Sequence, residues 1–222
     1  MLSKTRGIVF RFTKYGETSI IVNVFTELFG LQTYIVNGVR TKSAKSKIAL
    51  YQPLTLLDMV VYFRENANIK RIKEVKCLHP YLTIPFNISK SSIAIFISEI
   101  LNKTVKEESH AKELFNFLCY SLQVFDSLHG EAENFHLIFL LKLSRFLGFG
   151  AHNVNEILGH RMADPEIEKI LAQLVQAEYE DRISITKSQR LKILDYLLGF
   201  YTDHMETLGE IKSVQVLKDV LG

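Results

Sequence analysis

The pattern of apolar and polar residues divides the chain into a first part typical of strands and a longer second part typical of helices. Residues 7–13 (GIVFRFT) alternate, which predicts a strand whose side chains point to opposite faces in turn. One face would carry Ile8, Phe10 and Phe12, and the other Val9, Arg11 and Thr13. Gly16 then supplies the backbone freedom for a turn.

Four more strands are predicted from β-branched and apolar runs separated by turns. They cover residues 18–26, 31–38, 54–63 and 69–78. Five short strands, with a long connection between the third and the fourth, fit a small barrel of the OB (oligonucleotide-binding) type better than a sandwich. We expect Phe10, Phe12 and Phe25 to be core residues.

Beyond a short linker bracketed by Pro80 and Pro85, apolar residues recur at a spacing of three to four, which predicts helices. These helices are expected over 89–105, 110–128, 133–150, 165–177, 187–206 and 213–221. The first would bury Ile93, Phe96, Ile97 and Ile100, with Ser89 or Ser91 as its N-cap. The predicted fold class is therefore α+β, with a five-stranded OB-type barrel domain at 1–80 and an all-helical domain at 81–222.

The charge is unevenly distributed between these two parts. Residues 1–80 hold 13 Lys and Arg against five Asp and Glu, a net charge of +8, and the remainder of the chain has a net charge of −5. A basic first third joined to an acidic remainder indicates that the first third meets a polyanion.

The longest connection between predicted strands concentrates this positive charge. Arg40, Lys42, Lys45 and Lys47 fall within eight positions, without an acidic residue among them. OB barrels grip single-stranded nucleic acid with a positive groove and aromatic side chains on which bases stack. We therefore predict nucleic-acid contacts for the four loop cations and for Arg11 and Lys14, with Tyr15 and Tyr34 as candidate stacking residues.

Other classes of protein find little support in the sequence. The chain lacks a signal-peptide pattern and apolar runs of membrane-spanning length, so we expect a cytoplasmic protein without a membrane partner. Cys77 and Cys119 are expected to be buried thiols, although a disulfide stays possible. The histidines show no metal-ligand spacing, and phosphate-loop and serine-hydrolase motifs are missing. We predict neither an enzyme nor a bound cofactor.

Several stretches resemble the bacterial recombination mediator family RecO. Residues 7–40 and 45–62 are similar to that family's N-terminal barrel in the order of the first strand, the hairpin, the basic turn and the fourth strand. LLKLSRFLGFGAHN (140–153) resembles its central helix, and IKSVQVLKDVL (211–221) its last helix. The resemblance covers nearly the whole chain, and it depends on the order and spacing of the motifs.

The resemblance implies a non-enzymatic, nucleoid-associated DNA repair protein. Such proteins bind single- and double-stranded DNA, anneal complementary strands, bind RecR and the acidic tail of single-stranded DNA-binding protein (SSB), and help load the RecA recombinase. The family's basic turn corresponds to Gly38, Arg40 and Lys42, continued by Lys45 and Lys47. Many members also carry a four-cysteine zinc ribbon after the central helix. Residues 150–164 contain no cysteine, so we predict that the ribbon is degenerate or absent and that no zinc binds.

The site for the SSB tail needs an apolar pocket beside a cation. Lys142 and Arg145, within an apolar helix, fit this description. A basic pair on the exposed edge of that buried helix is the better interpretation, and tail binding at these residues is the weaker hypothesis. An RNA-binding or ribosome-associated OB protein is the main alternative function. A metal-dependent nuclease is a weaker one, since clustered carboxylates are not evident in the sequence.

Overall fold

The computed structural model describes residues 1–41, 45–65, 67–106, 111–129, 132–206 and 208–221. The chain forms two compact units. The first unit holds residues 1–81 together with 105–123, and the second holds 82–104 together with 124–222. The domain boundary expected at residue 80 stays a prediction. Part of the helical segment, residues 105–123, groups with the barrel.

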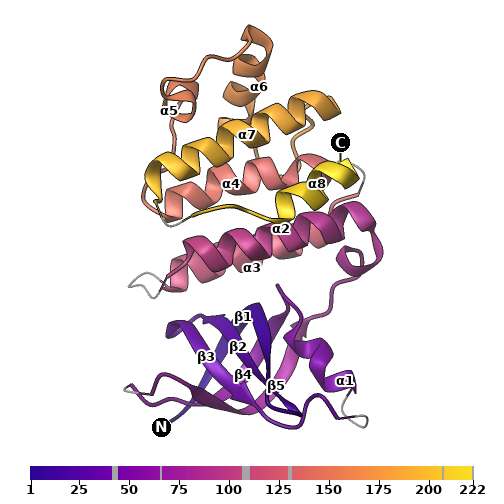
Figure 1. Ribbon diagram of the computed structural model, residues 1–222, viewed down its shortest axis with the longest axis vertical. Coiled ribbons are helices and arrows are strands. Elements are labelled where there is room, and N and C mark those ends of the chain that lie inside the picture. The colour runs from indigo at the N-terminus through magenta and orange to yellow at the C-terminus, as the bar shows by residue number, and fades with distance from the viewer. Residues whose placement is uncertain (42–44, 66, 107–110, 130–131, 207, 222) are drawn as a thin grey trace. The chain divides into compact units, whose positions relative to one another are not determined.

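The first unit contains a closed barrel of five strands, which confirms the predicted OB-type barrel (Figure 1). Its strands are β1 (Leu2–Tyr15), β2 (Ser19–Thr26), β3 (Gly30–Val36), β4 (Leu56–Tyr62) and β5 (Lys70–His79). Around the barrel they follow the order β1-β2-β3-β5-β4, and β4 pairs with β1 to close it. The β3–β5 pair is parallel, which brings the start of β5 beside the end of β3.

A bulge in β1 makes the predicted alternation wrong in the middle of that strand. Val9 pairs with Val24, but the next pair joins Arg11 to Asn23, so the register shifts and Phe10 is the extra residue of a β-bulge. Val9 consequently points into the barrel core, whereas Phe10 stacks on the ring of Phe25, with ring centres 5.6 Å apart. Beyond the bulge Phe12 is half-buried against the core, and Arg11 is exposed.

The barrel core also anchors the basic connection between β3 and β4. The core consists of Val9, Ile20, Val22, Val24, Tyr34, Val39, Tyr51, Leu57, Met59 and Val61. Val39 lies just after β3 and Tyr51 ends the short helix η2 (Ala49–Tyr51), which follows α1 (Lys45–Ile48). Both side chains are almost completely buried, at 3% and 2% exposure. The connection is therefore attached to the barrel at both of its ends.

Helix α3 (Ala111–Ser127) contributes most of its length to the first unit, where Arg6 of β1 contacts it. The Arg6 guanidinium lies 5.0 Å from the centre of the Phe115 ring and donates to Asn116 Oδ1 at 3.2 Å. It also donates to both carboxylate oxygens of Glu27, at 2.9 and 2.7 Å. This hydrogen-bonded pair lowers the pKa of the Glu27 carboxyl.

Helices make up the second unit, as the spacing of its apolar residues predicts (Figure 1). They are α2 (Ile88–Thr104), α4 (Phe135–Phe146), α5 (Val154–Leu158), α6 (Pro165–Gln176), α7 (Lys187–His204) and α8 (Ser213–Leu221). Short 3-10 turns, η3 (Ile84–Phe86) and η4 (Ala132–Asn134), precede α2 and α4. The α+β class is thus confirmed. None of the helices in the described ranges has the length and apolar character that crossing a bilayer requires.

Helix α2 buries the predicted face but begins earlier than expected. Ile93, Phe96, Ile97 and Ile100 are completely buried. The cap is Asn87, whose Oδ1 accepts the Lys90 backbone N–H at 3.0 Å, and not Ser89 or Ser91, which both lie inside the helix. The prediction of a serine cap was wrong because another good capping residue precedes both serines.

A single carboxylate fixes the chain where the second unit begins. Asp126 accepts backbone N–H groups from Leu82, Thr83 and Ile84 at 2.8, 2.9 and 3.0 Å. Burial alone would raise the pKa of Asp126, but these hydrogen bonds outweigh it and lower the pKa below its ordinary value. The ammonium of Lys90 donates to the Asp126 backbone carbonyl at 2.9 Å.

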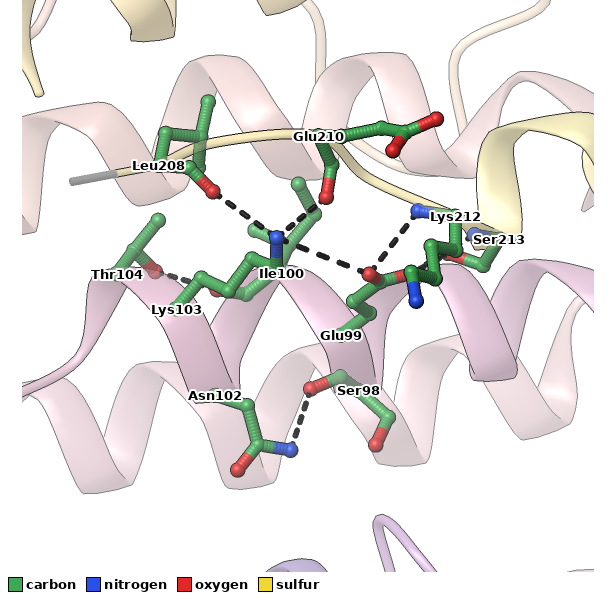
Figure 2. A network of polar contacts seen from close by, with 10 residues as sticks. All are labelled: Ser98, Glu99, Ile100, Asn102, Lys103, Thr104, Leu208, Glu210, Lys212 and Ser213. Carbon is green, nitrogen blue, oxygen red and sulfur yellow. Dashed lines mark hydrogen bonds and ion pairs between the residues drawn. The ribbon is translucent and has the colours of Figure 1, made fainter. Parts of the chain in front are cut away.

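The C-terminal helix α8 is capped by a side chain of another helix (Figure 2). Glu99 of α2 accepts the backbone N–H groups of Lys212 and Ser213 at 3.0 and 2.8 Å, and the Ser213 hydroxyl at 2.6 Å. One turn further along α2, the Lys103 ammonium donates to the backbone carbonyls of Leu208 and Glu210. Figure 2 shows both side chains reaching from α2 to the segment that enters α8.

Gly148 terminates helix α4. Gly148 has φ +88°, and its N–H donates to the carbonyl of Arg145, while the Phe149 N–H donates to that of Ser144. These two bonds form a Schellman motif, in which a residue with positive φ terminates the helix. Gly148 therefore ends the helix.

Candidate nucleic-acid interface

Arg11 and Lys14 are both exposed on β1, on the stretch that leads into the β1–β2 turn. The bulge at Phe10 turns the Arg11 side chain outward, where its guanidinium lies 3.5 Å from Thr13 Oγ1. Lys14 stands one residue before the end of the strand. Tyr15, which ends it, is 53% exposed and stays a candidate for base stacking.

Arg40 joins the basic connection to this turn. Its backbone N–H donates to the carbonyl of Thr18 at 3.0 Å, and its guanidinium Nη1 donates to the carbonyl of Gly16 at 2.9 Å. Gly16 adopts φ +54°, a turn conformation that favours glycine. Arg40 therefore lies at the same end of the barrel as Lys14 and Arg11, and we call these three cations the basic rim.

The other predicted loop cations are only partly described. Lys47 is exposed in α1, within the connection anchored by the barrel core. Lys42 and the side chain of Lys45 lie outside the described residues, so their predicted DNA contacts stay predictions. Contacts of Arg11, Lys14, Arg40 and Lys47 with nucleic acid likewise stay predictions.

Ion pairs neutralise several cations elsewhere on the barrel. Asp58 lies 3.8 Å from the ammonium of Lys4 and 3.3 Å from that of Lys76, and Glu74 lies 3.4 Å from that of Lys73. In contrast, Arg11, Lys14 and Lys47 form no ion pair with any described residue. The basic rim and its connection therefore carry positive charge that no described acidic side chain compensates.

Tyr34 cannot be a stacking residue, which corrects the sequence prediction. Its side chain lies in the barrel core with 0% exposure, opposite Val22. Burial raises the pKa of its hydroxyl, whose oxygen has no hydrogen-bond partner among the described residues. A base could not reach this ring without opening the barrel.

Lys142 and Arg145, the pair predicted to bind the SSB tail, lie on α4 and contact residues at or just after the end of α6. The Lys142 ammonium pairs with Glu178 at 2.8 Å and lies 5.5 Å from the centre of the Tyr179 ring. Arg145 Nη2 donates to the backbone carbonyl of Val175 at 2.9 Å. Both cations thus have partners within the second unit, although Arg145 is exposed. Binding of the SSB tail at these two residues stays a prediction.

Residues 150–164 do not fit a zinc ribbon. Helix α5 occupies the middle of this stretch and is capped by Asn153, whose side chain accepts the Glu156 N–H at 3.1 Å. The Glu156 carboxylate in turn accepts the His152 backbone N–H at 2.7 Å. Within the described part of the chain, His, Cys, Asp and Glu side chains nowhere gather in threes that could hold a metal ion. Cys77 is half-buried and Cys119 buried, and both are free thiols.

Comparison with known proteins gives the same family along the whole chain. Residues 1–81 match the family model "Recombination protein O N terminal", and residues 85–166 match "Recombination protein O C terminal". The DNA repair protein RecO of Bacteroides fragilis is 33% identical over 240 aligned positions, which cover 99% of both chains. Those of Phocaeicola vulgatus and Flavobacterium psychrophilum are each 31% identical, with 99% of both chains covered. The chain therefore belongs to the RecO family, and this membership supports a role in DNA repair and recombination.

Proposed function

We propose that the chain is a non-enzymatic recombination mediator that binds single- and double-stranded DNA and anneals complementary strands. With RecR it helps load RecA onto DNA coated by SSB. The observation that carries the proposal is the attachment of Arg40 to Gly16, which holds the basic connection against the turn beside Lys14. Together with the family membership, this cationic end of the barrel favours DNA as the ligand.

The physical basis of binding would be neutralisation of phosphates. Each phosphate contact made by a cation releases counterions, so the affinity is sensitive to salt and largely independent of sequence. Independence from sequence suits an annealing protein, which must accept any pair of complementary strands. Neutralising charge on both strands also lowers the repulsion that keeps them apart.

The helical unit would supply the partner sites. An acidic SSB tail ending in phenylalanine needs a cation beside apolar side chains. Arg145 is exposed at the end of α4, next to the half-exposed Phe146. If Arg145→Glu leaves the affinity for the tail peptide unchanged, tail binding at this position is refuted.

The test of DNA binding is a titration with a single strand, its blunt duplex and an RNA of the same sequence, each at several salt concentrations. Arg11→Gln/Lys14→Gln should lower the slope of log affinity against log salt by about 1.4 for the single strand and about 1.8 for the duplex. The matched control is Lys73→Gln/Lys76→Gln, which removes two exposed but ion-paired lysines of β5 and should change the slope less.

Three outcomes would count against the proposal. Equal changes of slope in the rim variant and the control would remove the basic rim from the DNA site. Stronger binding of RNA than of either DNA would favour the RNA-binding alternative. Shortening of the DNA in the presence of magnesium would show a nuclease.

A further inference from the structure

A row of paired residues runs across the outer face of the barrel and ends at a tyrosine. Thr13 of β1 pairs with Ile21 of β2, which pairs with Ile35 of β3. Ile35 pairs with Arg71 of β5, and Arg71 pairs with Tyr62 of β4. Since directly paired side chains share a face of the sheet, these five form one surface row that crosses all five strands.

The row begins at the basic rim. Thr13 is the residue that the Arg11 guanidinium approaches, and it directly precedes Lys14. With neighbouring strands about 4.8 Å apart, the row extends roughly 20 Å from β1 to β4. Site sizes of single strands on OB barrels are about 4–16 nucleotides, so one bound strand can follow the whole row.

At its far end the row opens into a hollow of about 560 Å³ at the loop between β4 and β5. Its lining consists of Tyr62, Arg64, Ala67, Ile69, Lys70 and Arg71. Tyr62 is 46% exposed and Ile69 48% exposed, so an aromatic ring and an aliphatic side chain both face the solvent here. The volume is in the range of about 300–1,000 Å³ that small organic groups occupy in proteins.

Two guanidinium groups in the hollow are available to a ligand. Arg64 and Arg71 are exposed, and neither side chain has a hydrogen bond or ion pair with another described residue. Lys70 differs, because its ammonium donates to the Ala67 carbonyl at 2.8 Å and lies 5.5 Å from the centre of the Phe63 ring. The hollow thus combines an open aromatic surface with two uncompensated positive charges.

We propose that this hollow binds one unpaired nucleobase of a single DNA strand, stacked on the Tyr62 ring, with Arg64 and Arg71 on the neighbouring phosphates. The inference rests on the proposed function and adds a preference to it. Bases of a duplex are stacked on each other and paired, so they cannot reach the ring unless they leave the helix. The basic rim contacts phosphates in either form of DNA, whereas the hollow selects the single strand.

The chain contains no tryptophan, which makes a direct test possible. Tyr62→Trp places a single indole in the hollow, and Tyr120→Trp is the matched control on the exposed side of α3, where Tyr120 is 55% exposed. Saturation with an oligothymidine strand should quench the fluorescence of Tyr62→Trp and leave that of Tyr120→Trp unchanged. A blunt duplex should quench the fluorescence of neither variant when it is bound to the same saturation, which is measured by the anisotropy of a labelled DNA.

Affinity provides the second readout. Tyr62→Ala should weaken binding of the single strand about tenfold and change the affinity for the duplex by no more than about twofold. Tyr62→Phe keeps an aromatic ring and should bind both forms of DNA as the unchanged chain does. Binding of the single strand without quenching in Tyr62→Trp, or equal weakening of both forms of DNA by Tyr62→Ala, overturns the inference while the proposed function stands. Failure of the unchanged chain to bind any DNA overturns the proposed function itself.

Discussion

The capping of α8 by Glu99 leads to a prediction whose size can be worked out from the structure. In Glu99→Gln, the amide keeps one oxygen that can accept, but its NH₂ group then faces a backbone N–H of Lys212 or Ser213. One hydrogen bond to a charged acceptor is lost, worth about 1.5–3 kcal/mol. The favourable interaction of a carboxylate with the N-terminus of α8, about 0.3–1 kcal/mol, is lost as well.

Since the Glu99 side chain is 22% exposed, solvent screens part of this effect, and we expect α8 to be destabilised by about 2 kcal/mol. Leu217 and Leu221 of α8 are buried, at 1% and 3% exposure, and they keep the helix packed in the folded state. We therefore expect local unfolding of α8 to become more frequent, while the helix stays folded most of the time. Each 1.4 kcal/mol corresponds to a factor of ten, so opening should become roughly 30-fold more frequent.

Hydrogen exchange measured by mass spectrometry on peptides covering 211–221 is the appropriate assay. Exchange of these amides should be about 30-fold faster in Glu99→Gln, with peptides of β1 unchanged. Glu210→Gln is the control, because Glu210 contributes its backbone carbonyl to the network and its own carboxylate is directed away from it (Figure 2). Equal exchange in the two variants would refute the capping role of Glu99.

The same carboxylate predicts a dependence on pH. Burial would raise the pKa of Glu99, but the hydrogen bonds from Ser213 and Lys212 and the charge of Lys103 hold it below its ordinary value of 4.5. A group whose pKa is lowered by folding stabilises the folded state above its unfolded pKa and loses this effect as the pH falls through the folded one. The difference in urea stability between the unchanged chain and Glu99→Gln should therefore be complete at neutral pH and disappear in acid. A difference that persists below the folded pKa would contradict this account.

Three further substitutions test other parts of the structure by urea unfolding. Asp126→Asn should lower the free energy of unfolding by about 3 kcal/mol, because an amide cannot accept all three backbone N–H groups of residues 82–84. A loss under about 1 kcal/mol would contradict the role of that carboxylate. Gly148→Ala should cost about 1–2 kcal/mol from positive φ alone, since an added Cβ meets no atom within 4 Å; no loss would contradict this strain. Tyr34→Phe should keep the free energy of unfolding or raise it by up to about 1 kcal/mol, because the buried Tyr34 hydroxyl lacks a partner among the described residues. The DNA affinity of this variant should be unchanged, and weaker DNA binding would restore Tyr34 as a site residue.

The strands and helices could be predicted because their signals are local. β-branched runs separated by turns predicted five strands, four of them close to the observed bounds, and the spacing of apolar residues predicted the long helices. The bulge at Phe10 could not be predicted, because it depends on the register between β1 and β2 and leaves no mark in the alternation of one strand. Length of the first strand was underestimated for a related reason: residues 2–6 pair with β4, which is distant in sequence.

The candidate site was predictable in its charges and not in its aromatic residues. Arg11, Lys14 and Arg40 stand out by residue type, but their gathering at one end depends on the bond from Arg40 to Gly16. Tyr34 and Tyr62 look alike in the sequence, since each lies near the end of an apolar strand. The pairing decides between them: Tyr34 lies opposite Val22 and points inward, whereas Tyr62 lies opposite Arg71 and faces the hollow.

The most direct test of the proposed function is annealing of two complementary strands, each coated with SSB from the same organism. The unchanged chain should speed annealing, and this effect should fall as the salt concentration rises. Arg11→Gln/Lys14→Gln should lose most of the effect, while Lys73→Gln/Lys76→Gln should retain it. If the unchanged chain does not speed annealing at any salt concentration, or if both variants lose the effect equally, the mediator function at the basic rim is contradicted.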